Sequence, residues 1–376
     1  MNPWRRILCL AFLFSCVLVR AEAEENLSEL LEPIRERNGL PALAGAIVTG
    51  DGAVATGATG VRRLGSPERV TTTDRWHLGS CTKAMTATML ASLVERGRLS
   101  WDATLAELYP ELAGGMDTGY RDVTLYQLLR HRGGTPEDLS PGGLWTRLWG
   151  MVEEPPMRQR RALVEGVLAR PPASRPGVEY LYSNAGYAIA GHAAERAEHD
   201  PWEILMLREL LGPLGMESAG FGPPGEPNEL SEPRGHRETP EGPKPVEPGP
   251  LADNPPAIGP AGTLHVTTSD WAKFVALHLA AASGSPRLLS AESFRRLQVP
   301  PEGEEYACGW LATERDWADG PVLTHAGSNT MWYCVVWIAP RKGFAVLACT
   351  NRGGEAAAAG CDQAAWAMIQ RRLEGK

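Results

Sequence analysis

Apolar residues recur along this chain of 376 residues with two different periods, and each period dominates a different part of it. Residues 27–35 place their apolar side chains at helical spacing. Two apolar runs, 42–49 and 53–59, then flank a Gly-Asp-Gly turn at 50–52. This order predicts a helix followed by a β-hairpin near the amino end.

The middle of the chain has mostly helical periodicity. Its clearest helix is predicted from residue 80 to residue 97, where apolar residues share one face and Gly97 supplies the stop. Further helices are expected at 125–130, 157–169, 185–197 and 201–211. Between 222 and 260 nearly half of the residues are glycine or proline, which predicts a long surface loop without regular structure.

Strand patterns return near the carboxyl end. A helix is predicted at 268–281 and another at 355–373, and the apolar runs between them predict strands at 306–311, 322–325, 331–339 and 344–350. Neither the early nor the late strands suffice alone for a covered sheet, so we expect both sets to combine into one antiparallel sheet. The predicted fold is therefore α+β, an α/β sandwich whose sheet is built from both chain ends, with an inserted helical lobe.

The expected organisation is one catalytic unit over residues 24–376. Its sheet subdomain would comprise about 24–79 plus 300–376, and its helical subdomain about 80–299. A content of 43% hydrophobic and 22% charged residues is typical of a folded globular protein. The net charge of −8, without a basic cluster beyond the first residues, argues against a nucleic-acid partner.

The first residues have the three parts of a signal peptide. Arg5 and Arg6 precede an apolar run at 7–19, and small residues follow up to Ala23. We expect residues 1–23 to be removed and the protein to be exported, to the periplasm or the medium. A retained membrane anchor is the alternative, although the run is shorter than the roughly 20 residues of a spanning helix. A lipoprotein modified at Cys16 is less well supported.

Cleavage at that point would leave an odd number of cysteines, so at least one thiol should stay free. Cys334 and Cys349 are equidistant from a turn at 340–343, and a hairpin with a two-residue loop would place them opposite each other. A cross-strand disulfide and a pair of neighbouring buried thiols are both compatible with this arrangement.

The first candidate chemistry is at Ser80 and Lys83, which lie one helical turn apart and can therefore meet. A serine hydroxyl becomes nucleophilic when a base takes its proton, and a lysine whose pKa is lowered by its surroundings can be that base. The alternative is a helix cap at Ser80 with a solvated Lys83.

Two further groups follow along the chain. Tyr182 could pass protons between a serine and a leaving group, and Asn184 could hydrogen-bond an acyl-chain amide, although Tyr182 could also be an ordinary core residue. His325, Gly327 and Ser328 end a predicted strand, where the glycine permits close approach of a substrate and a backbone amide could complete an oxyanion hole.

The order and spacing of these three groups resemble the penicillin-recognising serine hydrolases, the group of class C β-lactamases, D-alanyl-D-alanine peptidases and family VIII esterases. Similar stretches at 123–134, 213–216 and 259–264 extend the resemblance over residues 27–374. The resemblance implies Ser80 as nucleophile, with Lys83 and Tyr182 as the acid/base pair.

By the same resemblance Asn184 positions the substrate, and the amide of Ser328 pairs with that of Ser80. His325 stands where β-lactamases of this type carry lysine, and Ala326 lacks the hydroxyl that commonly holds a substrate carboxylate. Both departures weaken the case for an efficient β-lactamase or a strict carboxypeptidase and favour an esterase or an amidase. The expected activity is therefore that of an esterase or a D-amino-acid peptidase-like hydrolase, and a class C-type β-lactamase is the alternative.

The sequence lacks the G-x-S-x-G, H-E-x-x-H and C-x-x-C patterns, so neither metal nor cofactor is expected. The expected partner is a small-molecule or peptide substrate, and oligomeric state is not indicated. A non-catalytic penicillin-binding or sensor module is the alternative from another class. Loops at 133–156 and 222–260 should set substrate choice, with Trp145 and Trp149 as a substrate wall or as packing residues.

Overall fold

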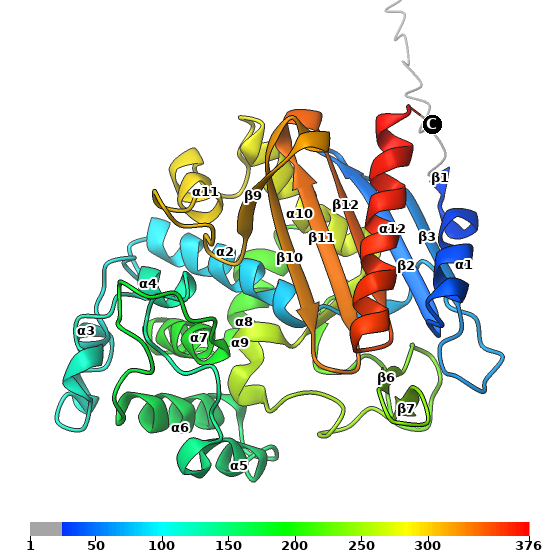
Figure 1. Cartoon of the computed structure of the whole chain (residues 1–376). Coiled ribbons are helices and arrows are strands. Elements are labelled where there is room, and N and C mark those ends of the chain that lie inside the picture. The colour runs from blue at the N-terminus through cyan, green and yellow to red at the C-terminus, as the bar shows by residue number, and fades with distance from the viewer. Residues whose placement is uncertain (1–24, 376) are drawn as a thin grey trace, which may run out of the picture.

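The structure is a computed structural model that describes residues 25–375. A seven-stranded sheet dominates it, with the strand order β1-β3-β2-β12-β11-β10-β9 (Figure 1). The strands are β1 (Glu25–Asn26), β2 (Ala42–Thr49), β3 (Gly52–Gly60), β9 (Leu311–Arg315), β10 (Gly320–Ser328), β11 (Tyr333–Ala339) and β12 (Phe344–Thr350).

Strands from both chain ends form this sheet, as the sequence predicts. β2 pairs with β12, so the amino-terminal hairpin and the carboxyl-terminal strands are continuous at the sheet centre. All pairings are antiparallel except that of the short edge strand β1, which runs parallel to β3. β12 is buried along its whole length and β2 in all but its last residue, because helices cover both faces of the sheet.

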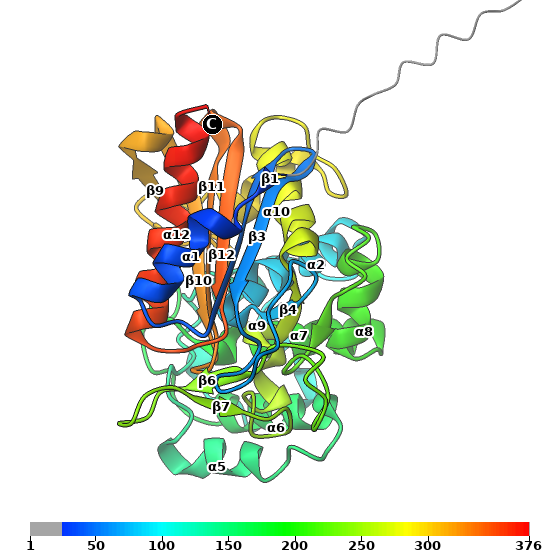
Figure 2. The same ribbon diagram turned by 90° about the vertical axis from the view of Figure 1, so that its right-hand side faces the viewer.

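Two helix layers enclose the sheet (Figure 2). α1 (Ser28–Arg37) and α12 (Glu355–Leu373) lie on one face, where they bury an apolar cluster that includes Leu31 and Met368. α10 (Thr268–Ala282) lies on the opposite face and joins the main core. The expected α+β sandwich is therefore confirmed.

A mostly helical lobe lies beside the sheet (Figure 1). Its longer helices are α2 (Thr82–Glu95), α6 (Pro156–Leu168) and α7 (Asn184–Glu198), and its shorter ones are α3 (Leu105–Leu108), α4 (Leu125–Leu129), α5 (Leu144–Trp149), α8 (Trp202–Met206) and α9 (Gly259–Gly262). α2 is buried on nearly all sides, because it contacts α7, α8 and α9 of the lobe and, through a hydrogen bond between Thr88 and His278, also α10.

Several sequence predictions need correction. Ser80 lies in a 3-10 turn (Gly79–Cys81), and the α-helix itself begins at Thr82. The strand predicted at 306–311 is displaced to β9, and only a single bridge joins Tyr306 to Leu311. The loop at 222–260 holds a short hairpin of β6 (Gly235–Arg237) and β7 (Lys244–Val246), contrary to the expectation of no regular structure.

A second, three-stranded sheet and several helices were not predicted. The sheet has the order β4-β8-β5, from β4 (Arg75–His77), β8 (Leu264–Thr267) and β5 (Gly220–Phe221). The helices include α3, α5, α9 and α11 (Ala291–Gln298). Strands of two to four residues are too short to show an alternating pattern. β4 leads directly into the turn that carries Ser80.

The hairpin of β11 and β12 places Cys334 opposite Cys349, as predicted, although its loop spans the four residues between Ala339 and Phe344 instead of two. Both cysteines are buried free thiols. The Sγ of Cys334 lies 3.5 Å from the Sγ of Cys81.

The proposed signal peptide at 1–23 lies outside the described residues. Within residues 25–375, no helix has both the length and the apolar character needed to span a membrane.

Candidate active site

Ser80 and Lys83 meet at the junction between the sheet and the helical lobe. The Nζ of Lys83 lies 2.9 Å from the Oγ of Ser80. The 3-10 turn and the first turn of α2 follow each other without a break, so the two side chains project to the same side. Ser80 is partly exposed, whereas Lys83 is fully buried.

The remaining contacts of Lys83 come from two other segments. Its Nζ donates to the Oδ1 of Asn184 at 2.8 Å and to the carbonyl oxygen of Ala261 at 2.8 Å. Burial disfavours the charged form and lowers the pKa of Lys83 from its ordinary value of 10.5 to about 7. As a neutral amine, Lys83 would keep two donors for Asn184 and Ala261 and turn its lone pair toward the Ser80 hydroxyl.

Tyr182 is the second group in contact with the Ser80 hydroxyl. Its hydroxyl donates to the Oγ of Ser80 at 2.8 Å. Burial raises the pKa of Tyr182, so the phenol is protonated at neutral pH. Tyr182 is thus placed as a proton donor, while Lys83 is placed as an acceptor.

His131 supports the segment that carries Tyr182. The imidazole ring lies 4.3 Å from the Tyr182 ring, centroid to centroid, and its Nδ1 accepts the backbone N–H of Ser183 at 3.1 Å. Burial lowers the pKa of His131 well below its ordinary value, so the ring is neutral. The sequence offered only a weak signal for this residue, a second H-x-G triplet at 131–133.

The end of β10 faces the Ser80 turn. Residues 320–324 of β10 pair with β9, but residues 325–328 pair with β11 alone, which leaves their other edge open toward that turn. The two backbones are in close contact: a Cβ on Gly327 would lie 2.0 Å from the carbonyl oxygen of Leu78, and one on Gly79 would lie 2.4 Å from the amide nitrogen of Ser328. Only glycine fits at either position.

His325 is held by two neighbours instead of pointing freely into the site. Its Nε2 lies 2.9 Å from the hydroxyl of Tyr306, and its Nδ1 lies 2.6 Å from the carbonyl oxygen of Ala326. A carbonyl can only accept, so Nδ1 carries a proton and donates it to Ala326, while Nε2 is engaged by the Tyr306 hydroxyl. Tyr306 had not been identified from the sequence, because it lies in a segment without a motif.

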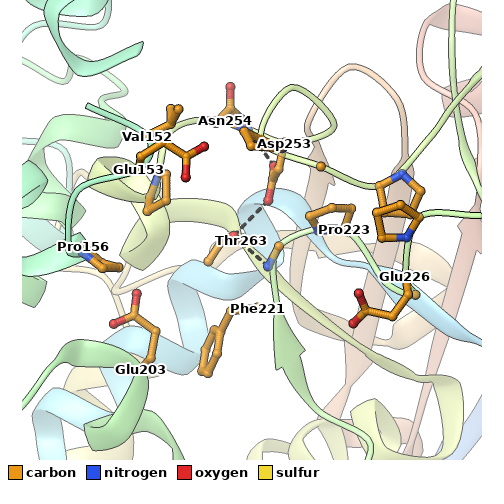
Figure 3. Close-up of a pocket in the computed structure, with 17 residues that line it drawn as sticks. Val152, Glu153, Pro156, Glu203, Phe221, Pro223, Glu226, Asp253, Asn254 and Thr263 are labelled. Carbon is orange, nitrogen blue, oxygen red and sulfur yellow. Dashed lines mark hydrogen bonds between the residues drawn. The ribbon is translucent and has the colours of Figure 1, made fainter. Parts of the chain in front are cut away.

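Two cavities share Asn254 in their lining, and only the smaller one is also lined by a residue of this site, Asn184. The smaller, of about 160 Å³, is lined by Asn184, Trp145 and Asn254. The larger, of about 520 Å³, also contacts Asn254 and lies between the segments at 152–156 and 222–256 (Figure 3). Both loops named from the sequence therefore line these cavities, and Trp145 is a wall of the smaller one.

Comparisons with known proteins agree with this architecture. A model of the Beta-lactamase family matches residues 27–367. Penicillin-binding protein 4 of Amycolatopsis lactamdurans is 27% identical over 335 residues, which cover 86% of this chain and 84% of that protein. A lovastatin esterase of Penicillium rubens is 30% identical over 181 residues, which cover 44% of this chain and 45% of the esterase.

Solved structures show the same fold at lower identity. A D-amino acid amidase of Ochrobactrum anthropi superposes with a TM-score of 0.73 at 18% identity, over 93% of this chain and 98% of the amidase. A D-alanine carboxypeptidase of Burkholderia cenocepacia superposes with a TM-score of 0.70 at 20% identity, over 91% of this chain and 97% of the carboxypeptidase. At such identities the likeness concerns the fold alone.

Proposed function

Because the chain belongs to the Beta-lactamase family, we propose that it is an exported serine hydrolase that forms an acyl-enzyme at Ser80 with an ester or amide substrate. The observation that carries the proposal is the convergence of two proton-handling groups on one hydroxyl. Lys83 and Tyr182 lie 2.9 and 2.8 Å from the Oγ of Ser80. A helix cap with a solvated lysine would not bury Lys83 completely.

In the proposed acylation, neutral Lys83 takes the hydroxyl proton of Ser80 while the Oγ attacks the substrate carbonyl carbon. The carbonyl oxygen becomes an oxyanion, and the backbone N–H groups of Ser80 and Ser328 stabilise it. As the intermediate collapses, Tyr182 donates its proton to the leaving alcohol or amine and recovers one from Lys83. Asn184 orients the acyl chain.

Deacylation repeats these steps with water as the nucleophile. Water loses a proton to the Lys83–Tyr182 pair, attacks the ester carbonyl, and the returning proton restores the Ser80 hydroxyl. The two groups that carry the protons, Lys83 and Tyr182, both lie within hydrogen-bond distance of the Oγ of Ser80. No step uses a metal or a cofactor.

The surroundings of His325 favour esters and amides over β-lactams. Tyr306 and Ala326 already engage both ring nitrogens, so His325 has no free donor for a substrate carboxylate. The two cavities are lined by carboxylates such as Glu137, Glu153 and Glu226, and neither has an arginine or lysine in its lining. An anionic substrate group would be repelled there.

The test is the intact mass of the protein after incubation with a fluorophosphonate and, separately, with a labelled penicillin, with Ser80→Ala as the control. Labelling by the fluorophosphonate alone, absent in Ser80→Ala, is expected for the esterase or amidase. Labelling by both reagents would favour a peptidase or a class C-type β-lactamase. Labelling by neither would leave the non-catalytic binding module as the better account.

Export is tested by sequencing the amino terminus of the protein recovered from outside the cytoplasm. That sequence should begin at Glu24, because the proposed cleavage follows Ala23. A terminus at Met1 in the membrane fraction would instead support a retained anchor.

A further inference from the structure

A second buried hydrogen-bond network lies behind the Ser80 turn. Its members are His77 at the end of β4, Asp253 in the proline-rich loop, and Asn329 immediately after β10. Their exposed fractions are 0, 6 and 3%, so their polar groups depend mainly on partners within the protein. None of the three has a role in the proton transfers proposed above.

His77 connects this network to the Ser80 turn. Its Nδ1 accepts the backbone N–H of Gly79 at 3.1 Å and therefore carries no proton. The proton is on Nε2, which donates to the Oδ2 of Asp253 at 2.8 Å. Two contacts at opposite ends of the ring thus determine one neutral tautomer and one ring orientation.

Asp253 is the centre of the network. Its Oδ2 also accepts the hydroxyl of Thr263 at 2.8 Å, and its Oδ1 accepts the side-chain amide of Asn329 at 3.0 Å and the backbone N–H of Asn254 at 2.8 Å. Figure 3 shows the carboxylate at the boundary between the larger cavity and the Thr263 segment. All four partners donate, which only an ionised carboxylate can satisfy.

Asn329 connects the network to the end of β10. Its Oδ1 accepts the backbone N–H groups of Met331 and Trp332 at 3.2 and 3.1 Å, which closes the turn after Ser328. Asp253 therefore joins the two backbone segments that contact each other at Gly79 and Ser328.

We propose that His77, Asp253 and Asn329 are positioning residues that set the spacing of the Ser80 and Ser328 backbone amides, so that both amides reach one oxyanion. This inference rests on the proposed function. Hydrogen-bond donors stabilise an oxyanion best when they are held in place before the reaction. The bond from Gly79 to His77 restrains the Ser80 side of the oxyanion hole, and the bonds to Asn329 restrain the Ser328 side. The network acts through the backbone and does not contact the substrate carbonyl.

The decisive variant is Asp253→Asn. A carboxamide keeps one accepting oxygen and presents an NH₂ group in place of the other. If the NH₂ group faces His77, the ring can keep the contact only by moving its proton to Nδ1, where the N–H of Gly79 would oppose it. If it faces the other way, it opposes two donors, the side-chain amide of Asn329 and the backbone N–H of Asn254. We expect kcat for p-nitrophenyl acetate to fall about a hundredfold, with KM changed by less than about threefold. Affinity for phenylboronic acid, which forms a tetrahedral adduct with a serine, should fall by about the same factor as kcat/KM.

Asp270→Asn is the matched control for the loss of a buried carboxylate. Asp270 is 7% exposed and accepts hydrogen bonds from Ser218, away from the Ser80 turn. If the role of Asp253 is purely structural, Asp253→Asn should behave like Asp270→Asn. Its thermal midpoint should fall, while the boronic acid affinity of the folded protein should stay unchanged. The positioning role predicts a loss of affinity in Asp253→Asn alone, at a thermal midpoint similar to that of Asp270→Asn.

A pair of His77 variants separates the two ring contacts. In His77→Asn the side-chain oxygen can occupy the position of Nδ1 and still accept from Gly79, whereas His77→Gln can reach Asp253 but not Gly79. We expect His77→Asn to be at least about tenfold faster than His77→Gln. Both variants lose the ring, so equal rates would indicate packing and overturn the inference.

Labelling of the wild type separates this inference from the proposed function. If the fluorophosphonate labels Ser80 in the wild type, and Asp253→Asn is labelled equally fast and binds the boronic acid equally well, the inference alone is overturned. If the wild type is not labelled at all, the proposed function fails, and the inference fails with it.

Discussion

The Nζ of Lys83 lies 2.9 Å from the Oγ of Ser80, with the lysine buried and the serine partly exposed. This difference in burial suits the two residues to the roles proposed above. The lysine loses its proton near neutral pH because water does not reach it, while the serine remains accessible to a substrate.

The rate of Ser80 acylation should therefore depend on pH through Lys83. The base is the neutral amine, and its pKa is about 7. We expect the rate of fluorophosphonate labelling to rise about tenfold per pH unit below pH 7 and to level off above it. Lys83→Arg cannot lose its proton in this range and should show no such limb. A flat profile in the wild type would exclude Lys83 as the base.

The same shift in pKa should appear in folding stability. Between pH 7 and pH 10.5 the unfolded chain binds a proton at Lys83 that the folded protein does not, so stability rises with pH across this window. Below pH 7 Lys83 is protonated in both the folded and the unfolded state, so the free-energy cost of burying its charge no longer changes with pH.

Urea unfolding at pH 7.5 and pH 9.5 measures this effect against Lys83→Met. We expect the wild type to gain about 2 kcal/mol relative to the variant between the two pH values. A constant difference between the two proteins would mean that Lys83 remains charged in the folded state.

Tyr182→Phe removes the 2.8 Å hydrogen bond to Ser80 while keeping the ring that packs on His131. The raised pKa keeps Tyr182 protonated, so the variant loses a proton donor and should turn over an ester at least a hundredfold more slowly. The rise of the rate with pH that is assigned to Lys83 should stay at the same pH. Tyr180→Phe, two residues away and 47% exposed, is the control and should retain nearly the full rate. A near-normal rate in Tyr182→Phe would assign the proton transfers to Lys83 alone.

The sequence predicted the parts of the site that depend on local geometry. Ser80 and Lys83 are three residues apart, so the helical spacing alone brings them together. Tyr182 and Asn184 come from a segment about 100 residues away, and it was the resemblance to a family, not the spacing, that placed them beside Ser80. The sheet could be predicted because its central strands are long apolar runs.

What the sequence did not predict depends on tertiary contacts without a local pattern. His77 belongs to a three-residue strand, and Asp253 lies in a loop whose composition predicted no structure. Tyr306 was placed in a predicted strand, yet its function in the fold is to hold the His325 ring. Each of these residues acquires its partners only when distant segments pack together.

Gly327→Ala tests the close approach of β10 to the Ser80 turn. The added Cβ would lie 2.0 Å from the carbonyl oxygen of Leu78 and 2.9 Å from the amide nitrogen of Ser80, and both are backbone atoms that cannot rotate away. The strand must shift, which displaces the amide of Ser328 from its place opposite Ser80. We expect a loss of about a hundredfold in kcat and about 1–3 kcal/mol in stability.

Gly114→Ala is the matched control, because a Cβ there meets nothing within 4 Å and the backbone has no positive φ. It should leave both the rate and the stability close to those of the wild type. Measuring both the stability and the labelling rate of Gly327→Ala distinguishes a role of the close approach in folding from a role in catalysis. If urea unfolding shows the expected loss while the folded fraction labels with fluorophosphonate at the normal rate, the approach of β10 stabilises the fold without building the oxyanion hole. If labelling slows in the fully folded protein, the separation of the two backbones is itself part of the catalytic geometry.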